Sequence, residues 1–176
     1  MKNLLVPVDF SDVTERVIAT AEQMARAFGA KVLLMHCIGE YPALTGMGEI
    51  PVFMPVPDVA LPGSFPEQYR KLADLTSSLR DKGIDAELLF VGGSAINEII
   101  TVADRHQIDM IIMGSHGHGA WFELLVGSVT EGVLRRVDRP TLIVPSEAPK
   151  EQRMAAIAPA SQWQESAATP YSSGPL

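Results

Sequence analysis

Residues 108–130 read IDMIIMGSHGHGAWFELLVGSVT, and this stretch contains the unit on which the fold prediction rests. Its apolar run at 108–113 has the length and composition of a buried β-strand. A glycine-rich segment follows at 114–119, and a helical pattern opens at 128 and continues to 138. A strand, a glycine-rich turn and a helix in this order are typical of an α/β protein, in which helices cover a mostly parallel sheet.

The same alternation of strand and helix runs from the start of the chain to residue 145. Further apolar runs predict strands at 3–8, 31–38, 86–91 and 141–145. Helical spacing predicts helices at 12–28, 66–82 and 94–106. The apolar runs lack in/out alternation, which is typical of strands covered on both faces. With right-handed crossovers, this order predicts an α/β fold with an open, doubly wound, parallel five-stranded sheet.

Composition excludes several classes of protein. The 176 residues fit one domain, and the net charge of −7 without a dense Lys/Arg cluster argues against binding to nucleic acid or to an anionic membrane surface. The single cysteine, Cys37, excludes an internal disulfide framework and a multi-cysteine zinc site. We find neither a secretory signal nor a run approaching the roughly 18 apolar residues of a spanning helix, so we expect a cytoplasmic protein without membrane insertion.

Two segments fall outside the alternating pattern. Residues 39–65 contain five prolines and four glycines, and a connection this long is either a lid or disordered. Residues 147–176 are rich in Ala, Ser, Pro and Gln and have little to bury, so we expect a flexible C-terminal tail. The folded domain is therefore predicted to span residues 1–146.

Three segments are predicted to meet at the carboxyl ends of the strands, where open α/β sheets bind their ligands. They are Pro7–Asp9, His36–Cys37, and the glycine-rich turn from Gly114 that leads to Gly127–Thr130. Glycines let a backbone approach a ligand closely, and a helix N-terminus attracts anions, so the last segment resembles a phosphate cradle. It is not the GxxxxGK[ST] loop, because it lacks both the lysine and that spacing.

Each of these features also has an interpretation that needs no ligand. Ser128 and Glu131 fit a capping box, and Asp9 fits a cap for the helix that follows it. His116 and His118 could share a metal ion, but no third ligand is evident, so we expect no metal site. Cys37 fits a buried small apolar residue.

The spacing Gly114-x2-Gly117-x9-Gly127-Ser128 resembles the ATP-binding motif of the universal stress protein family, G-x2-G-x9-G-[S/T]. The segments LLVPVDFSDVTERVI and KVLLMHCI resemble the first two strands of that family. The resemblance covers roughly residues 1–146. It implies a Rossmann-like domain with strand order 3-2-1-4-5, a homodimer, and ATP as the bound cofactor. We expect Mg²⁺ to accompany the ATP.

Transferred residue by residue, the resemblance also implies a set of ligand contacts. Pro7, Val8 and Asp9 would border the adenosine, and Cys37 would lie beside the adenine, where an aliphatic residue is usual. Met113, Gly114, His116 and Gly117 would line the path of the ribose and phosphates. Gly127, Ser128, Val129 and Thr130 would hold the phosphates. His118 stands where a basic residue is frequent, which would weaken charge neutralisation.

Three functions from different classes remain open at this point. The first is a nucleotide-binding regulatory protein acting in stress response, with an unidentified protein partner. The second is a slow ATPase or another nucleotide-using enzyme, but fast phosphoryl transfer needs charge stabilisation and no Lys or Arg lies between Gly114 and Leu134. We therefore expect no catalytic residues. The third is a nucleotide-free interaction module.

The final strand, at 141–145, is predicted to lie at an edge of the sheet. Leu142, Ile143 and Val144 would give that edge an apolar character with unpaired backbone groups, which is a liability unless it is covered. The same strand of a second chain, related by a two-fold axis, is the simplest cover. We therefore predict a homodimer through this strand, and the resemblance implies the same.

Overall fold

The computed structural model describes residues 1–39, 49–50, 65–115 and 127–146, with only the backbone described at 49–50. Contacts between Cα atoms divide the chain into two units, Met1–Ser146 and Glu147–Leu176. The predicted flexible tail therefore lies outside the described residues.

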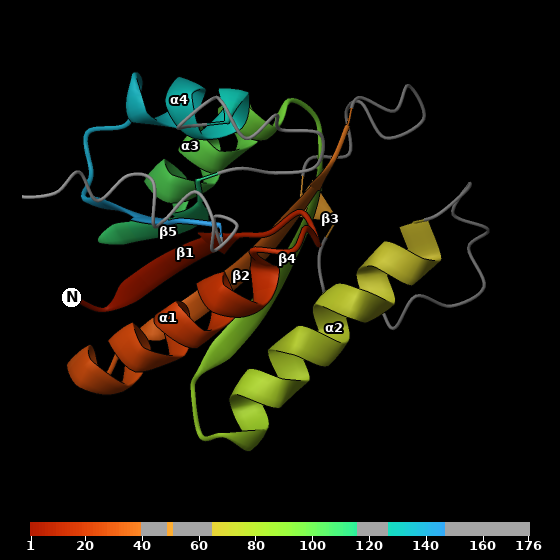
Figure 1. The fold of residues 1–176 in the computed structure, drawn as a ribbon, viewed down its shortest axis with the longest axis vertical. Coiled ribbons are helices and arrows are strands. Elements are labelled where there is room, and N and C mark those ends of the chain that lie inside the picture. Colours follow the sequence, from red (N-terminus) through yellow and green to blue (C-terminus); the bar gives the residue numbers. More distant parts are fainter. Residues whose placement is uncertain (40–48, 51–64, 116–126, 147–176) are drawn as a thin grey trace, which may run out of the picture. The chain divides into compact units, whose positions relative to one another are not determined.

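Five parallel strands form the body of the sheet (Figure 1). They are β1 (Asn3–Pro7), β2 (Lys31–Ile38), β4 (Ala86–Gly92), β5 (Met110–Gly114) and β6 (Thr141–Val144). Their order across the sheet is β4-β2-β1-β5-β6, which confirms the predicted order 3-2-1-4-5 of the five parallel strands. The predicted strand bounds agree with the observed ones to within two residues.

A sixth strand was not expected from the sequence. β3 (Glu49–Ile50) pairs antiparallel with β4 and lies at the far edge of the sheet, within the segment interpreted as a loop at 39–65. Two residues are too few to give a recognisable pattern of apolar residues in the sequence. The pairing of β3 depends instead on the edge of β4, which is available to it.

Two helices cover each face of the sheet (Figure 1). α1 (Thr14–Phe28) and α2 (Phe65–Asp81) pack in one core layer, while α3 (Ala95–Arg105) and α4 (Ser128–Leu134) pack in the other. α4 ends four residues earlier than predicted because its last turn tightens, with the Arg136 N–H donating to the Val133 carbonyl at 2.9 Å. Within the described parts of the chain, no helix has the length and apolar character needed to cross a bilayer.

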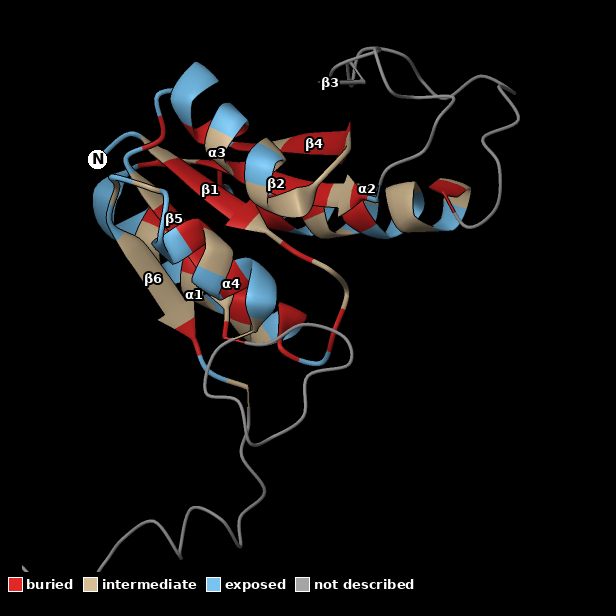
Figure 2. Cartoon of the chain, turned by 90° about the horizontal axis from the view of Figure 1, so that it is seen from above, coloured by how far each residue is buried: buried red, intermediate tan, exposed pale blue. Residues whose placement is uncertain are grey.

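Alternate residues of each strand supply the two core layers. In β1, Leu4 and Val6 face α1 and α2, whereas Leu5 faces α3 and α4, and all three are fully buried. Burying a side chain of this size stabilises the fold by roughly 1.5–3 kcal/mol. Figure 2 shows the buried residues concentrated along the strands and the exposed ones on the outer sides of the helices. The continuous apolar runs in the sequence therefore reflect coverage on both faces, as predicted.

Candidate functional site

All five parallel strands end at the same edge of the sheet, and the chain reverses its direction of winding at β1. From β1 it proceeds through β2 to β4 on one side, and then crosses through α3 to β5 on the other side. The switch point therefore lies between the carboxyl ends of β1 and β5, which is where α/β sheets of this kind bind ligands. Pro7 ends β1 and Gly114 ends β5, so the residues predicted to contact the ligand flank this switch point.

The segment after β1 is fixed by hydrogen bonds to β2 and within itself. The Val8 N–H donates to the Met35 carbonyl at 2.8 Å. The Asp9 Oδ1 accepts from the Ser11 N–H at 3.1 Å and from the Ser11 hydroxyl at 2.6 Å. The N-cap of α1 is Val13, without a side-chain hydrogen bond. The interpretation of Asp9 as a helix cap is therefore wrong, because its carboxylate closes the turn that precedes α1.

Cys37 lies near the end of β2 and is half-buried. Its thiol donates to the Gly93 carbonyl at 3.3 Å. Burial raises the pKa of the Cys37 thiol to about 11, with a smaller contribution from the negative charge of Glu98. The thiol is therefore neutral at pH 7, and Cys37 fits a packing role beside a ligand better than a nucleophilic one.

The end of β5 is joined directly to the start of α4. The Gly127 N–H donates to the Ser115 carbonyl at 2.6 Å, and the Thr130 hydroxyl donates to the Gly114 carbonyl at 2.9 Å. The Ser115 N–H in turn donates to the Val144 carbonyl of β6 at 2.8 Å. Residues 127–130 are thus held against the carboxyl end of β5, as the glycine spacing predicts.

The N-terminus of α4 has no side-chain cap. Its N-cap is Gly127, with an extended backbone at φ −69° and ψ 156°, and Ser128 is already the first helical residue. The predicted capping box is therefore not formed. The Glu131 carboxylate pairs instead with the Arg135 guanidinium at 2.7 Å, four residues further along α4. The first N–H groups of a helix have no acceptor within it, so those of α4 remain suited to an anion.

The structure describes the predicted site residues except His116 and Gly117, which lie outside the described residues together with His118. Met113 and Cys37 both pack in the core layer that contains α3 and α4. The predicted contacts from β2, β5 and α4 therefore belong to one face of the sheet, next to the switch point. Within the described ranges, no three His, Cys, Asp or Glu side chains cluster in a way that could hold a metal ion.

Three residues at this edge have contacts that the sequence did not reveal, although His36 is part of the segment His36–Cys37 that was predicted to lie here. Phe10 has a positive φ of 61°, Ser11 holds the Asp9 carboxylate, and His36 Nδ1 lies 2.7 Å from the Val8 carbonyl oxygen. The sequence signal for the role of His36 is its place as a histidine inside the otherwise apolar run KVLLMHCI.

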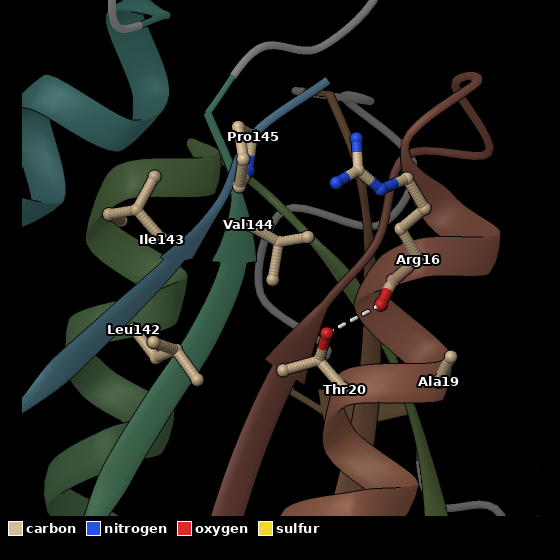
Figure 3. A pocket seen from close by; sticks show the side chains of 7 residues that line it. All are labelled: Arg16, Ala19, Thr20, Leu142, Ile143, Val144 and Pro145. Atoms are coloured by element: carbon tan, nitrogen blue, oxygen red, sulfur yellow. Dashed lines mark hydrogen bonds between the residues drawn. The ribbon is translucent and has the colours of Figure 1, made fainter. Parts of the chain in front are cut away.

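A second surface feature lies at the β6 edge of the sheet. A groove of about 380 Å³ runs between α1 and β6 and is lined by Arg16, Ala19, Thr20 and residues 142–145 (Figure 3). The Arg16 Nη1 is buried and has no hydrogen-bond partner among the described residues. In the described sheet β6 pairs with β5 on one side only, so its other side has unpaired backbone groups.

Comparison with known proteins supports the interpretation of the fold and the motif. The chain matches the model of the universal stress protein family over residues 1–145. It is 29% identical over 152 residues to the universal stress protein MJ0577 of Methanocaldococcus jannaschii, with 81% of this chain and 94% of the relative covered. The solved structure of that archaeal protein matches with a TM-score of 0.67 at 27% identity, covering 84% of this chain and 98% of the other.

Two further solved structures contain nucleotides. A universal stress protein in complex with cAMP matches with a TM-score of 0.60 at 24% identity, covering 83% of this chain and 98% of the other. A universal stress protein of Archaeoglobus fulgidus in complex with dAMP matches with a TM-score of 0.59 at 20% identity, covering 81% and 97%. At these identities the likeness shows the shared fold. Because the family model matches nearly all of residues 1–146, the chain belongs to the universal stress protein family.

Proposed function

We propose that this chain is a cytoplasmic regulatory module that binds ATP, with Mg²⁺, at the switch point between β1 and β5. The observation that carries the proposal is the arrangement at that edge. The ends of β1, β2 and β5 lie beside the uncapped start of α4, and two hydrogen bonds join α4 to β5. Adenine nucleotides in two solved structures of this fold support the choice of ligand class.

The residues present fit an adenine nucleotide. Val8, Asp9 and Cys37 would border the adenosine, and Cys37 offers a neutral, half-buried surface to the base. Gly127 would leave room for the phosphates beside the start of α4, and the backbone N–H groups from Ser128 to Thr130 would hold them. When bound, Mg²⁺ would supply positive charge to the triphosphate, since no Lys or Arg lies between Gly114 and Leu134.

The same scarcity of positive charge favours regulation over catalysis. Rapid phosphoryl transfer requires groups that stabilise charge on the transferred phosphate and position a nucleophile. The Glu131 carboxylate, one candidate base, is engaged by Arg135 at 2.7 Å and is exposed on α4. A slow ATPase remains the second candidate function, and phosphate release measured over hours separates it from simple binding.

We also propose that two copies associate through β6. The unpaired side of this strand would form an antiparallel pair with the same strand of a second copy. The groove between α1 and β6 runs along this edge, and its apolar lining from residues 142–145 supports an interface there (Figure 3).

Identification of the bound nucleotide tests the proposed function. The purified protein is denatured, released nucleotides are identified by chromatography, and the nucleotide-free protein is titrated with Mg-ATP, Mg-ADP and AMP by calorimetry. We expect ATP to be recovered and to bind most tightly. Absence of any nucleotide binding would instead favour the nucleotide-free interaction module.

A substitution at Gly127 tests the position of the site. Gly127→Val is compatible with the extended backbone at this N-cap, but its side chain would obstruct approach to the start of α4. We expect binding to be lost while the protein stays folded. Ser94→Val is the matched control, since Ser94 is the extended N-cap of α3 and also lacks a side-chain cap bond. Equal affinity in the Gly127 variant and the wild type would contradict the assignment.

A further inference from the structure

The segment that follows β1 has an unfavourable backbone conformation. Phe10 has φ 61°, and a bulky side chain rarely adopts this left-handed conformation. Such a conformation persists only where the surrounding structure holds it in place, and it occurs frequently at ligand sites. Phe10 stands directly between Asp9 and Ser11, whose side chains are hydrogen-bonded to each other. Whatever holds Phe10 in this conformation therefore also influences the orientation of Asp9.

His36 holds the strained segment in two ways. Its Nδ1 lies 2.7 Å from the Val8 carbonyl oxygen, and because a carbonyl can only accept, Nδ1 carries the proton. Its ring also packs against Phe10, with ring centroids 4.4 Å apart. Phe90 of β4 supports the ring at 5.7 Å. His36 thus contacts the residue before Asp9 through a hydrogen bond and the residue after it through its ring.

The other ring nitrogen of His36 has no hydrogen-bond partner within the described part of the chain. His36 is 6% exposed, and its Nε2 atom is buried. Burial lowers the pKa of His36, and the hydrogen bond to Val8 and the negative charge of Asp9 oppose this only in part. Among the described residues, the carboxylate of Asp9 is the charged group that acts on the ring, and Tyr69 of α2 contacts the neighbouring Phe90. The ring is therefore neutral at pH 7.

An unpaired buried nitrogen is unfavourable, and an aliphatic residue in this apolar strand would avoid it. The hydrogen bond from Nδ1 is thus the property that distinguishes His36 from its apolar neighbours in β2. His36 lies on the side of the sheet that faces α1 and α2, since its ring contacts Phe10 and Phe90 belong to that layer. The predicted ligand contacts Cys37 and Met113 pack on the opposite side.

We propose that His36 is a positioning residue for the nucleotide site, acting from the opposite face of the sheet by holding Val8 and Phe10 so that Asp9 is correctly oriented. The expected effect of His36 on ligand affinity rests on the proposed function. The effect of His36 on the backbone of residues 8–11 does not depend on any ligand, so affinity and backbone protection are measured separately.

Two substitutions separate the hydrogen bond from the packing. His36→Asn keeps a donor, because its Nδ2 is as many bonds from Cα as the Nδ1 of histidine. His36→Leu fills the position without a donor. Leu79→Ala in α2 is the control for general loss of stability, since Leu79 is fully buried in the same core layer. Calorimetry with Mg-ATP reports affinity, and hydrogen exchange of the Phe10, Ser11 and Asp12 amides, measured without ligand, reports the segment.

The Leu variant is expected to bind Mg-ATP about tenfold more weakly, the size of effect of one good hydrogen bond. Exchange at the three amides should also be faster. The Asn variant should have an affinity for Mg-ATP and amide exchange rates near the wild-type values. Leu79→Ala should leave the affinity unchanged and should not speed exchange at these three amides more than elsewhere in the domain.

Wild-type exchange and affinity in the Leu variant would overturn the positioning role, as would a folded Asn variant that behaves like the Leu variant. If the wild-type chain binds no nucleotide, the proposed function fails. The exchange data then decide the role of His36 alone: faster exchange in the Leu variant, restored by Asn, supports it, and unchanged exchange overturns it.

Discussion

The hydrogen bond from Thr130 to Gly114 is the contact that most directly joins α4 to the sheet at the candidate site. Thr130 is 4% exposed, and its hydroxyl donates to the Gly114 carbonyl at 2.9 Å. Thr130→Val replaces the hydroxyl with a methyl group of similar size, so it removes this bond without opening a cavity. A hydrogen bond contributes about 0.5–1.5 kcal/mol net, and a carbonyl left buried without its donor costs about 1–3 kcal/mol.

We therefore expect Thr130→Val to lower the free energy of unfolding by about 1–2 kcal/mol, or roughly 3–8 °C in Tm for a domain of this size. Thr76→Val is the matched control. Thr76 is 1% exposed, and its hydroxyl donates to the Leu72 carbonyl at 2.8 Å within α2. The Leu72 carbonyl already accepts the regular helical hydrogen bond. Removing the Thr76 hydroxyl should therefore lower the free energy of unfolding by less than about 0.5 kcal/mol.

Urea unfolding of the two variants gives both free energies from the midpoints, provided that the m values agree with the wild type. Titration with Mg-ATP should show weaker binding for the Thr130 variant, because the start of α4 loses its connection to β5. Equal destabilisation by the two substitutions, or unchanged binding by the Thr130 variant, would refute the inference that this bond positions α4.

Four further outcomes are expected. Ile143→Lys should convert the proposed dimer into monomers by placing a charge on the edge of β6, as measured by light scattering, and a wild type that is already monomeric would contradict the proposed β6 interface. A chain ending at Ser146 should keep its Tm within about 4 °C and its affinity for Mg-ATP, because residues 147–176 have little to bury. Since burial lowers the pKa of His36 below its unfolded value near 6.5, stability should fall as the pH drops below about 6.5. The Tm difference between the wild type and His36→Asn should therefore shrink from pH 7.5 to pH 5.5. Cys37 should react slowly with iodoacetamide at pH 7.5 and much faster in urea, because its pKa is raised to about 11; rapid labelling of the folded protein would contradict its burial.

The sequence predicts the parallel strands well because a strand that is buried on both faces is a continuous apolar run. Such a run can be recognised in the sequence without knowing which strands lie beside it. The run at 31–38 is reproduced residue for residue by β2. β3 could not be predicted, since residues 49–50 pair with β4 for reasons that lie outside their own segment. The predicted end of α4 at residue 138 is wrong because the apolar spacing continues to Val137, whereas α4 ends at Leu134.

At the candidate site, residue type and spacing identified the segments but not their local hydrogen bonds. Ser128 and Glu131 have the spacing of a capping box, yet Gly127 occupies the N-cap and Glu131 turns towards Arg135. Similarly, a helix cap is one of the two interpretations that the sequence allows for Asp9, but α1 begins at Thr14, too far along the chain for Asp9 to cap it. Whether Ser128 or Asp9 caps a helix depends on the exact residue at which that helix begins. Apolar spacing defines the start of a helix only to within one or two residues.

The contact between His36 and Val8 shows how strand register creates a site that no local motif records. Pro7 pairs with Met35 in the parallel ladder of β1 and β2, so the next residues, Val8 and His36, also become neighbours. Side chains alternate along a strand, and His36 therefore shares a face with Leu34 and Ile38, which lie in the layer of α1 and α2. Cys37, one position further, faces the layer of α3 and α4. A shift of one residue in this register would exchange the two side chains between the faces. The same pairing that builds the core thus places Cys37 on the side of the proposed ligand and His36 against the segment that carries Asp9.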